Sequence, residues 1–293
     1  YVVDERDVGE IASFVATGLE WRRQSSAPSA GGAPCFASVD AAAGVLVVAN
    51  YKTGSIAVYR LSDDGSITPS PVVLQGHGSG PVKDRQDGPH AHCARFCGSR
   101  LYWTDLGADR VLVCRYEPVG GVVEAPFEAF VAEPGDGPRH IAFHPTLPRA
   151  YLLTELSSRL IVLEVHADGR LTTLAGHSTL PAGFAGESIG GHLALNAADE
   201  RLYVSNRGHD SISVFGLDDA GDVALRQTIA TGGRSPRHFR LVQEARVVIA
   251  AHEESDTITV LPVTDNGGLS DPIQQISCPG PVYIGAASLD TAW

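Results

Sequence analysis

The chain of 293 residues carries 22 Lys and Arg against 34 Asp and Glu, a formal net charge of −12, and the absence of any basic run excludes a nucleic-acid-binding surface. A hydrophobic fraction of 43% can form a large core, but no apolar run approaches the roughly 20 residues that cross a bilayer, so we expect no membrane segment. Five cysteines, an odd number without disulfide-framework spacing, favour a reducing compartment, and we predict a cytoplasmic protein.

Apolar segments that end in polar or charged residues recur along the chain every 45 to 54 residues. They occupy residues 1–5, 47–51, 101–105, 151–155, 203–207 and 248–252. A polar turn and a β-branched segment follow each of them, at residues 9–14, 54–59, 110–115, 159–164, 210–215 and 256–261. Turns of the Asx-Gly type then lead into a further strand. This repeat predicts an all-β fold, a β-propeller of four-stranded antiparallel blades.

The first strand of each repeat opens on a short Gly- or Pro-containing segment. These segments are Ala33-Pro34-Cys35, Gly88-Pro89-His90, Gly137-Pro138-Arg139, Gly190-Gly191-His192, Ser235-Pro236-Arg237 and Gly280-Pro281-Val282. Five repeats are complete, the N-terminal residues supply the later strands of another, and residues 280–288 supply a first strand. The chain also lacks methionine and begins inside an apparent strand, so we expect a missing N-terminal portion. Residues 1–293 would then be a single domain of seven blades, with six as the alternative.

Strand ends of a propeller converge on one face, because the first strands line the central channel. Two rings of side chains follow from the repeat. The first ring comprises Cys35, His90, Arg139, His192 and Arg237, and the second comprises Glu5, Tyr51, Asp105, Glu155, Arg207 and His252. In the hairpin of residues 139–155, antiparallel pairing should bring Arg139 and Glu155 to the same edge of the sheet. These rings are the predicted site.

The residue types in the rings suit a small anionic ligand. Guanidinium forks bind carboxylate or phosphate, so Arg139, Arg207 and Arg237 are candidate anion-binding groups. Glu155 beside arginines should stay ionised and could act as a general base, while His90 or His92 could donate a proton to a leaving oxygen. The same groups could instead be structural, as a buried ion pair between blades and as hydrogen-bonded histidines.

Metal chemistry is not predicted. Cys93 and Cys97 are four residues apart, which is about 13 Å on an extended strand and too far for both to hold one zinc ion. Asp63-Asp64 and Asp218-Asp219 could hold calcium, but such aspartates more often form turns. We therefore expect no metal and no cofactor.

Several segments together resemble the seven-bladed propeller lactonases, which include bacterial 6-phosphogluconolactonases and fungal 3-carboxy-cis,cis-muconate lactonizing enzymes. The resemblance is carried by residues 137–145, 151–158, 202–212, 89–92 and 235–239 and covers nearly the whole chain. It implies a central groove in which His90 or His92 and Arg139, Glu155, Arg207 and Arg237 match functional positions. His192 departs from the family pattern, where an aspartate is more usual.

The resemblance implies a metal-independent lactonase, with 6-phosphogluconolactone as the expected substrate and the pentose phosphate pathway as its setting. We expect Glu155, His90, His92 and Arg139 to be catalytic and Arg207, Arg237, His192 and Tyr51 to bind substrate. One alternative is a cycloisomerase acting on a carboxylated muconate. Another is a non-enzymatic propeller that binds a protein or peptide, because fold does not fix function.

Overall fold

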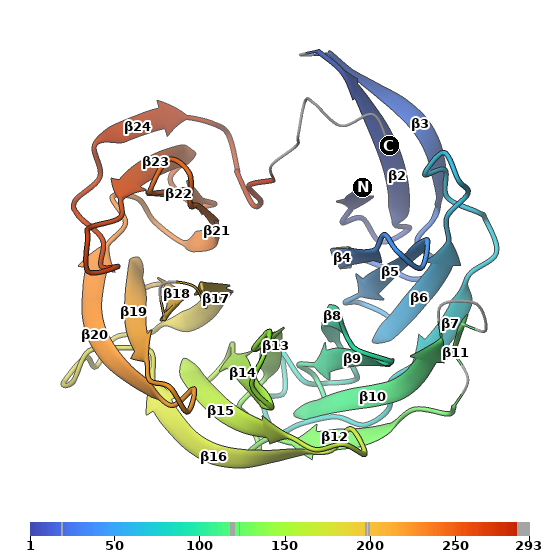
Figure 1. Ribbon diagram of the computed structural model, residues 1–293, viewed down its shortest axis with the longest axis horizontal. Coiled ribbons are helices and arrows are strands. Elements are labelled where there is room, and N and C mark those ends of the chain that lie inside the picture. Colours follow the sequence, from blue (N-terminus) through green and yellow to red (C-terminus); the bar gives the residue numbers. More distant parts are fainter. Residues whose placement is uncertain (19, 118–120, 123, 197, 199, 286–293) are drawn as a thin grey trace. The chain divides into compact units, whose positions relative to one another are not determined.

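The computed structural model describes residues 1–18, 20–117, 121–122, 124–196, 198 and 200–285. These residues form strands and turns, and none of them belongs to a helix long and apolar enough to cross a bilayer. The described strands pair into six antiparallel sheets, each from consecutive strands (Figure 1). Residues 1–141 and 167–171 form a first compact unit, and residues 142–166 together with residues 172–285 form a second.

The first unit contains three sheets. They are β1 (Val2–Asp4), β2 (Glu10–Thr17) and β3 (Glu20–Pro28); β4 (Pro34–Asp40), β5 (Val45–Asn50), β6 (Ser55–Arg60) and β7 (Val72–Gln75); and β8 (Ala91–Cys97), β9 (Arg100–Asp105) and β10 (Arg110–Glu117), with β11 (Gly121–Val122) and β12 (Phe127–Val131) both on β10. The three-stranded first sheet agrees with the prediction that the N-terminal residues supply only later strands of a repeat.

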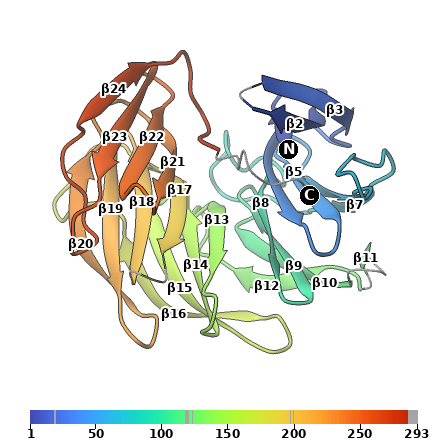
Figure 2. The same ribbon diagram turned by 45° about the horizontal axis from the view of Figure 1, so that its top comes forward.

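The second unit contains most of one further sheet and two complete ones. They are β13 (Pro138–Phe143), β14 (Arg149–Thr154), β15 (Arg159–Val165) and β16 (Leu171–Ser178); β17 (Ile189–Asn196), β18 (Arg201–Arg207), β19 (Ser211–Leu217) and β20 (Val223–Ala230); and β21 (Pro236–Val242), β22 (Val247–His252), β23 (Thr257–Pro262) and β24 (Gln274–Ser277). The sheets β17–β20 and β21–β24 lie side by side (Figure 2). The unit boundary passes through β13, after Ile141.

The strand order confirms propeller blades of four antiparallel strands, but one predicted strand is wrong. Residues 280–285 form no strand, and residues 286–288 lie outside the described part of the chain. The seven-blade count and the single domain stay predictions.

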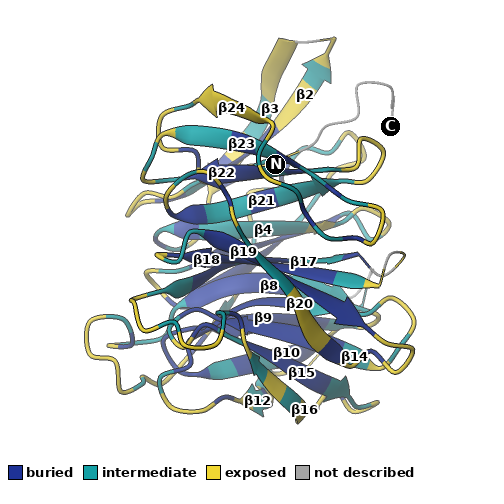
Figure 3. Cartoon of the chain, turned by 90° about the vertical axis from the view of Figure 1, so that its left-hand side faces the viewer, coloured by how far each residue is buried: buried dark blue, intermediate teal, exposed yellow. Residues whose placement is uncertain are grey.

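The second strands β5, β9, β14 and β18 are almost entirely buried, whereas the fourth strands β7 and β24 are mostly exposed (Figure 3). Every residue of β5 is buried, while all four residues of β24 are exposed. This explains the continuous apolar runs in the inner strands, because a strand covered on both sides needs no polar face. Trp103 of β9 is fully buried and packs in one core cluster with residues of β5.

A repeated tyrosine ties neighbouring blades together within each unit. Its hydroxyl donates to a backbone carbonyl in the last turn of the next blade. The bonds run from Tyr1 to Gly65 (2.7 Å), Tyr102 to Gly169 (3.2 Å), Tyr151 to Gly221 (2.9 Å) and Tyr203 to Gly267 (2.8 Å). Burial raises the pKa of Tyr102 and Tyr151 to about 12, so these hydroxyls remain donors at neutral pH.

Candidate functional site

A β-bulge lies at the start of the first strand in four described blades. Pairing between β8 and β9 passes from Ala91 directly to Cys93, so His92 has no partner residue on β9. The same irregularity skips Cys35 in β4 and Arg237 in β21. In β17 the irregularity lies between Gly190 and Leu193 and includes Gly191 and His192. A bulge turns one side chain away from the regular alternation of a strand and is common beside active sites.

The bulges correct the predicted first ring. Equivalent bulge residues are Cys35, His92, Gly191 and Arg237, and Arg139 follows Pro138 as Arg237 follows Pro236. His90 precedes the strand β8, and His192 follows Gly191 within the irregularity of β17, so neither occupies the ring position assigned to it.

The second ring was also out of register at two positions. Tyr51 and Glu155 directly follow β5 and β14, and the equivalent residue after β22 is Glu253. Asp105 and His252 are instead the last residues of their strands and are fully buried. Burial lowers the pKa of His252, which favours the neutral imidazole. Glu5 follows β1 as predicted and is exposed.

In the first unit, Tyr51 joins the two candidate histidines. Its ring stacks on His90 with centroids 4.4 Å apart and meets the edge of His92 at 5.7 Å. The ring centroid of His92 lies 5.5 Å from that of His140, which was not among the predicted site residues. Both His92 and His140 are more than nine-tenths buried. The aromatic rings therefore form one packed cluster.

Arg139 ends this cluster. Its Nη1 lies 3.0 Å from Nε2 of His140, and Arg139 is only 3% exposed. Because a guanidinium only donates, Nε2 of His140 must accept, and the ring is neutral with its proton on Nδ1. Thr104 holds the backbone of the arginine through a 2.8 Å bond to its carbonyl. The predicted residues Tyr51, His90, His92 and Arg139 thus belong to one part of the first unit.

Asp105 anchors the segment that leads into His92. Its Oδ1 accepts the backbone N–H groups of His90 (2.7 Å) and Ala108 (3.1 Å). Burial raises its pKa to about 6, although these hydrogen bonds and the charge of His90 oppose the rise. The ring of His90 is fixed as well, since Nδ1 lies 2.9 Å from the carbonyl of Tyr51 and Nε2 lies 3.2 Å from Asp87.

In the second unit, Glu155 and Arg207 form a buried ion pair. Arg207 Nη2 lies 2.8 Å from Glu155 Oε2, and the two side chains are 10% and 3% exposed. The same guanidinium donates to the carbonyl of Gly190 (2.9 Å), while the N–H of Gly190 donates to the carbonyl of Glu155 (2.8 Å). The pair therefore links the start of β17 to the end of β14, and the arginine stabilises the ionised carboxylate.

Arg237 and His192 lie in two further contacts of the second unit. Arg237 Nη1 is 3.4 Å from Glu253, and this looser pair is partly exposed to solvent. His192 packs against His238 with ring centroids 4.0 Å apart. His238 in turn packs against Tyr283 (4.4 Å). Glu253, His140 and His238 were missed, although the sequence Pro-Arg-His at 138–140 and 236–238 was a visible signal for the histidines.

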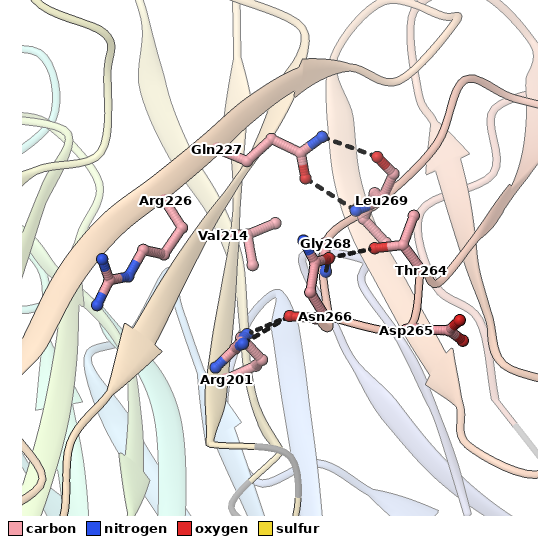
Figure 4. A pocket seen from close by; sticks show the side chains of 9 residues that line it. All are labelled: Arg201, Val214, Arg226, Gln227, Thr264, Asp265, Asn266, Gly268 and Leu269. Atoms are coloured by element: carbon pink, nitrogen blue, oxygen red, sulfur yellow. Dashed lines mark hydrogen bonds between the residues drawn. The ribbon is translucent and has the colours of Figure 1, made fainter.

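A separate cavity of about 750 Å³ in the second unit contains none of the predicted residues (Figure 4). Its lining is Arg201, Val214, Arg226, Gln227, Thr264, Asp265, Asn266, Gly268 and Leu269. The amide of Gln227 exchanges bonds of 2.7 and 2.8 Å with the backbone of Leu269. Arg201 donates to the carbonyl of Asn266 in the turn that Tyr203 also binds. These polar groups join two blades, so we assign the cavity to blade packing.

Comparisons with known proteins identify the family. The profile described as "Lactonase, 7-bladed beta-propeller" matches residues 1–286. A 6-phosphogluconolactonase of Bacillus subtilis is 34% identical over 260 residues, which are 87% of this chain and 73% of that protein.

Solved structures agree. A periplasmic gluconolactonase of Pseudomonas aeruginosa, PpgL, has a TM-score of 0.86 and 31% identity, covering 95% of this chain and 82% of that one. A protein from Lactobacillus plantarum has a TM-score of 0.87, also at 31% identity and with the same coverage. The chain therefore belongs to the seven-bladed β-propeller lactonase family and is a carboxylic-ester hydrolase that opens lactones.

Proposed function

We propose that the protein hydrolyses a small anionic sugar-acid lactone, with 6-phosphogluconolactone as its substrate and 6-phosphogluconate as its product. The observation that carries the proposal is the buried pair of Glu155 and Arg207, 2.8 Å apart, which keeps a carboxylate ionised at the end of a blade strand. The B. subtilis and P. aeruginosa relatives, named for 6-phosphogluconolactone and gluconolactone hydrolysis, support a sugar lactone.

In the proposed reaction Glu155 removes a proton from water as the water oxygen attacks the lactone carbonyl carbon. The carbonyl oxygen becomes an oxyanion, which a guanidinium stabilises by donating hydrogen bonds. The bond from this carbon to the ring oxygen then breaks, and the ring oxygen takes a proton from a histidine. Arg139, Arg207 and Arg237 are the proposed groups for the oxyanion and the phosphate, and no metal takes part.

Among the two candidate histidines, we propose His92 as the proton donor and His90 as a support. Both ring nitrogens of His90 already face acceptors, the carbonyl of Tyr51 and the carboxylate of Asp87. His92 is the bulge residue of β8, and the substrate-binding candidate Arg237 is the equivalent bulge residue of β21. Tyr51 stacks on His90 and orients both rings. His192, which lies within the irregularity of β17, is proposed to contact the sugar part of the substrate.

The test is hydrolysis of freshly generated 6-phosphogluconolactone, with the spontaneous rate subtracted. We expect enzymatic acceleration and a lower KM for this lactone than for the uncharged gluconolactone. Equal kinetics for the two would contradict a role of the arginines in binding phosphate. A loss of ultraviolet absorbance with carboxylated muconates, and no lactone hydrolysis, would favour the cycloisomerase instead.

We also propose a cytoplasmic location, where a phosphorylated sugar lactone would be available. The P. aeruginosa relative is described as a periplasmic gluconolactonase. The alternative to a cytoplasmic enzyme for the phosphorylated lactone is therefore a periplasmic enzyme for the unphosphorylated lactone. Fractionation of cells that produce the protein from its natural gene would decide between them. Recovery outside the cytoplasm, with preference for the unphosphorylated lactone, would overturn both parts of the proposal.

A further inference from the structure

We infer that Asp109 and Asp210 are positioning residues for Arg139 and Arg237, each holding the backbone two residues before its arginine. The inference rests on the proposed function, in which these arginines bind the charged lactone. Neither aspartate was among the predicted site residues, and both lie in turns between the second and third strands of their blades.

The aspartates occupy one place in the repeat. Asp109, Asp210 and Asp256 each come immediately before the third strand of a blade. Their φ angles are 54°, 56° and 53°, in the left-handed region. Asp is among the few residues other than Gly that adopt this conformation readily. The shared backbone points the three carboxylates in the same way relative to their blades.

Each carboxylate accepts the N–H of a residue in the following inter-blade connection. Asp109 Oδ1 accepts from Gly137 (2.7 Å) and its Oδ2 accepts from Gly135 (2.7 Å). Asp210 Oδ1 accepts from Ser235 (2.7 Å). Hydrogen bonds to an ionised acceptor are roughly twice as strong as those between neutral groups. In both blades the connection is therefore held at the residue directly before the proline, Gly137 or Ser235.

Both fixed residues have a positive φ, which is free of strain for glycine but strained for serine. Gly137 and Ser235 directly precede Pro138 and Pro236, and their φ angles are 66° and 57°. A positive φ is disfavoured for serine, and the following proline restricts the backbone further. The bond from Ser235 to its aspartate holds this conformation in place. Such strain persists only where surrounding structure enforces it, and it clusters at functional sites.

The arginine follows at once. Proline fixes its own φ, so little rotational freedom separates the anchored residue from the arginine that comes next. Arg237 lies on the bulge of β21, where the backbone turns its side chain out of the regular alternation. A shift of the anchored residue would thus move the guanidinium. An error of about 1 Å in the placement of a binding group can reduce activity by a factor of about 100.

The chain contains its own control. Asp256 accepts the N–H of Gly280 (2.8 Å), which has a φ of 50° and precedes Pro281. The geometry is the same, but Val282 stands where the other two blades have arginine. Removing this carboxylate tests the structural effect of the anchor alone.

The experiment compares Asp109→Asn, Asp210→Asn, Asp210→Ala and Asp256→Ala in hydrolysis of 6-phosphogluconolactone. In Asp109→Asn a single amide oxygen replaces two accepting oxygens, so one N–H loses its acceptor. In Asp210→Asn one oxygen suffices, because the N–H groups of Gly208 and Ser235 both bind Oδ1. We expect kcat/KM to fall about tenfold in Asp109→Asn and Asp210→Ala, and less than about twofold in Asp210→Asn and Asp256→Ala.

Two measurements distinguish a misplaced arginine from a partly unfolded protein. A misplaced guanidinium raises KM for the anionic lactone, whereas a partly unfolded population lowers kcat at unchanged KM. Hydrogen exchange of residues 135–139 and 235–239 gives a measurement without substrate, and we expect faster exchange in Asp109→Asn and Asp210→Ala, each in its own segment.

If the wild-type protein opens no lactone, the proposed function fails, and the exchange data alone decide the anchoring. Unchanged exchange in both segments, or equal loss of activity in Asp256→Ala and Asp210→Ala, would overturn the inference.

Discussion

Two buried carboxylates, one in each unit, occupy adjacent places in the repeat and have different surroundings. Asp105 is fully buried, and its hydrogen bonds in the described part of the chain come from backbone N–H groups. Glu155 is 2% exposed and lies against the guanidinium of Arg207. Burial alone raises the pKa of Asp105 to about 6, whereas a cation favours the ionised form of Glu155. Both carboxylates are buried, so the guanidinium beside Glu155 is what distinguishes their electrostatic surroundings.

The substitution Glu155→Gln tests this difference between the two carboxylates and should have the largest effect. If Glu155 is the general base, kcat for lactone hydrolysis should fall by a factor of about 100 or more, because the amide cannot accept the proton. The measurement is the initial rate with spontaneous hydrolysis subtracted. The matched control is Glu253→Gln, at the equivalent position, whose pair with Arg237 is looser and more exposed.

Stability must be measured beside the rate. The Gln variant leaves the buried Arg207 without its carboxylate, which can cost about 3–5 kcal/mol, whereas loss of the exposed pair of Glu253 should cost at most about 1 kcal/mol. Rates are therefore compared at a temperature at which circular dichroism shows both variants to be folded. Full activity of folded Glu155→Gln would remove this residue from the mechanism.

The next effect concerns Asp105 and depends on pH. Its folded-state pKa of about 6 lies above the ordinary 3.8, so the folded protein binds this proton more tightly than the unfolded chain. The resulting stabilisation is fully present below about pH 3.8 and is lost as pH rises through 6. Asp105→Asn keeps an oxygen acceptor for His90 and carries no charge. We expect this variant to exceed the wild type by about 3 kcal/mol in the free energy of unfolding at pH 7.5.

Urea unfolding at several pH values checks this expectation. The difference between Asp105→Asn and wild type should shrink towards zero near pH 4. A difference that stays constant from pH 4 to 7.5 would show that the carboxylate is not destabilised by burial, and the contrast with Glu155 would disappear.

The repeat in the sequence determines which parts of the fold and of the candidate site can be predicted. Apolar runs and Asx-Gly turns recur with each blade, so the strand pattern and the positions of Glu155 and Arg207 could be read directly. A bulge inserts one residue without changing the apolar pattern. The register therefore slipped at His90 and His192.

Other parts of the site depend on turns rather than strands. Asp109 and Asp210 act through backbone conformation and hydrogen bonds, which composition and alternation do not reveal. Their recurrence ahead of the third strands was nevertheless visible in the sequence. Charge partners are also non-local, and the pairing of Arg207 with Glu155, 52 residues apart, required the three-dimensional register.

A smaller effect is expected when the segment of residues 88–92, which carries His90 and His92, is displaced. A Cβ added at Gly107 would lie 1.8 Å from the carbonyl oxygen of Gly88 and 2.7 Å from Cδ2 of His90. Gly107→Ala must therefore displace this segment, and we expect a loss of about 1–3 kcal/mol in stability together with reduced kcat. Gly88→Ala is the control, because its Cβ would meet nothing within 4 Å. Equal behaviour of the two variants in both measurements would contradict the prediction.

The smallest effects are expected from removing the tyrosine hydroxyls that join neighbouring blades. They test whether the same hydrogen bond stabilises the blades of both units. Tyr102→Phe in the first unit and Tyr203→Phe in the second each remove a hydroxyl that donates to a glycine carbonyl, at 3.2 and 2.8 Å. Each change should reduce the free energy of unfolding by about 1 kcal/mol, with unchanged KM, because each hydroxyl donates to a turn between the third and fourth strands of a neighbouring blade. Urea unfolding followed by fluorescence measures both. A loss confined to one variant would show that the blades of the two units are joined by different interactions, and that the contrast between the units extends beyond their carboxylates to the packing itself.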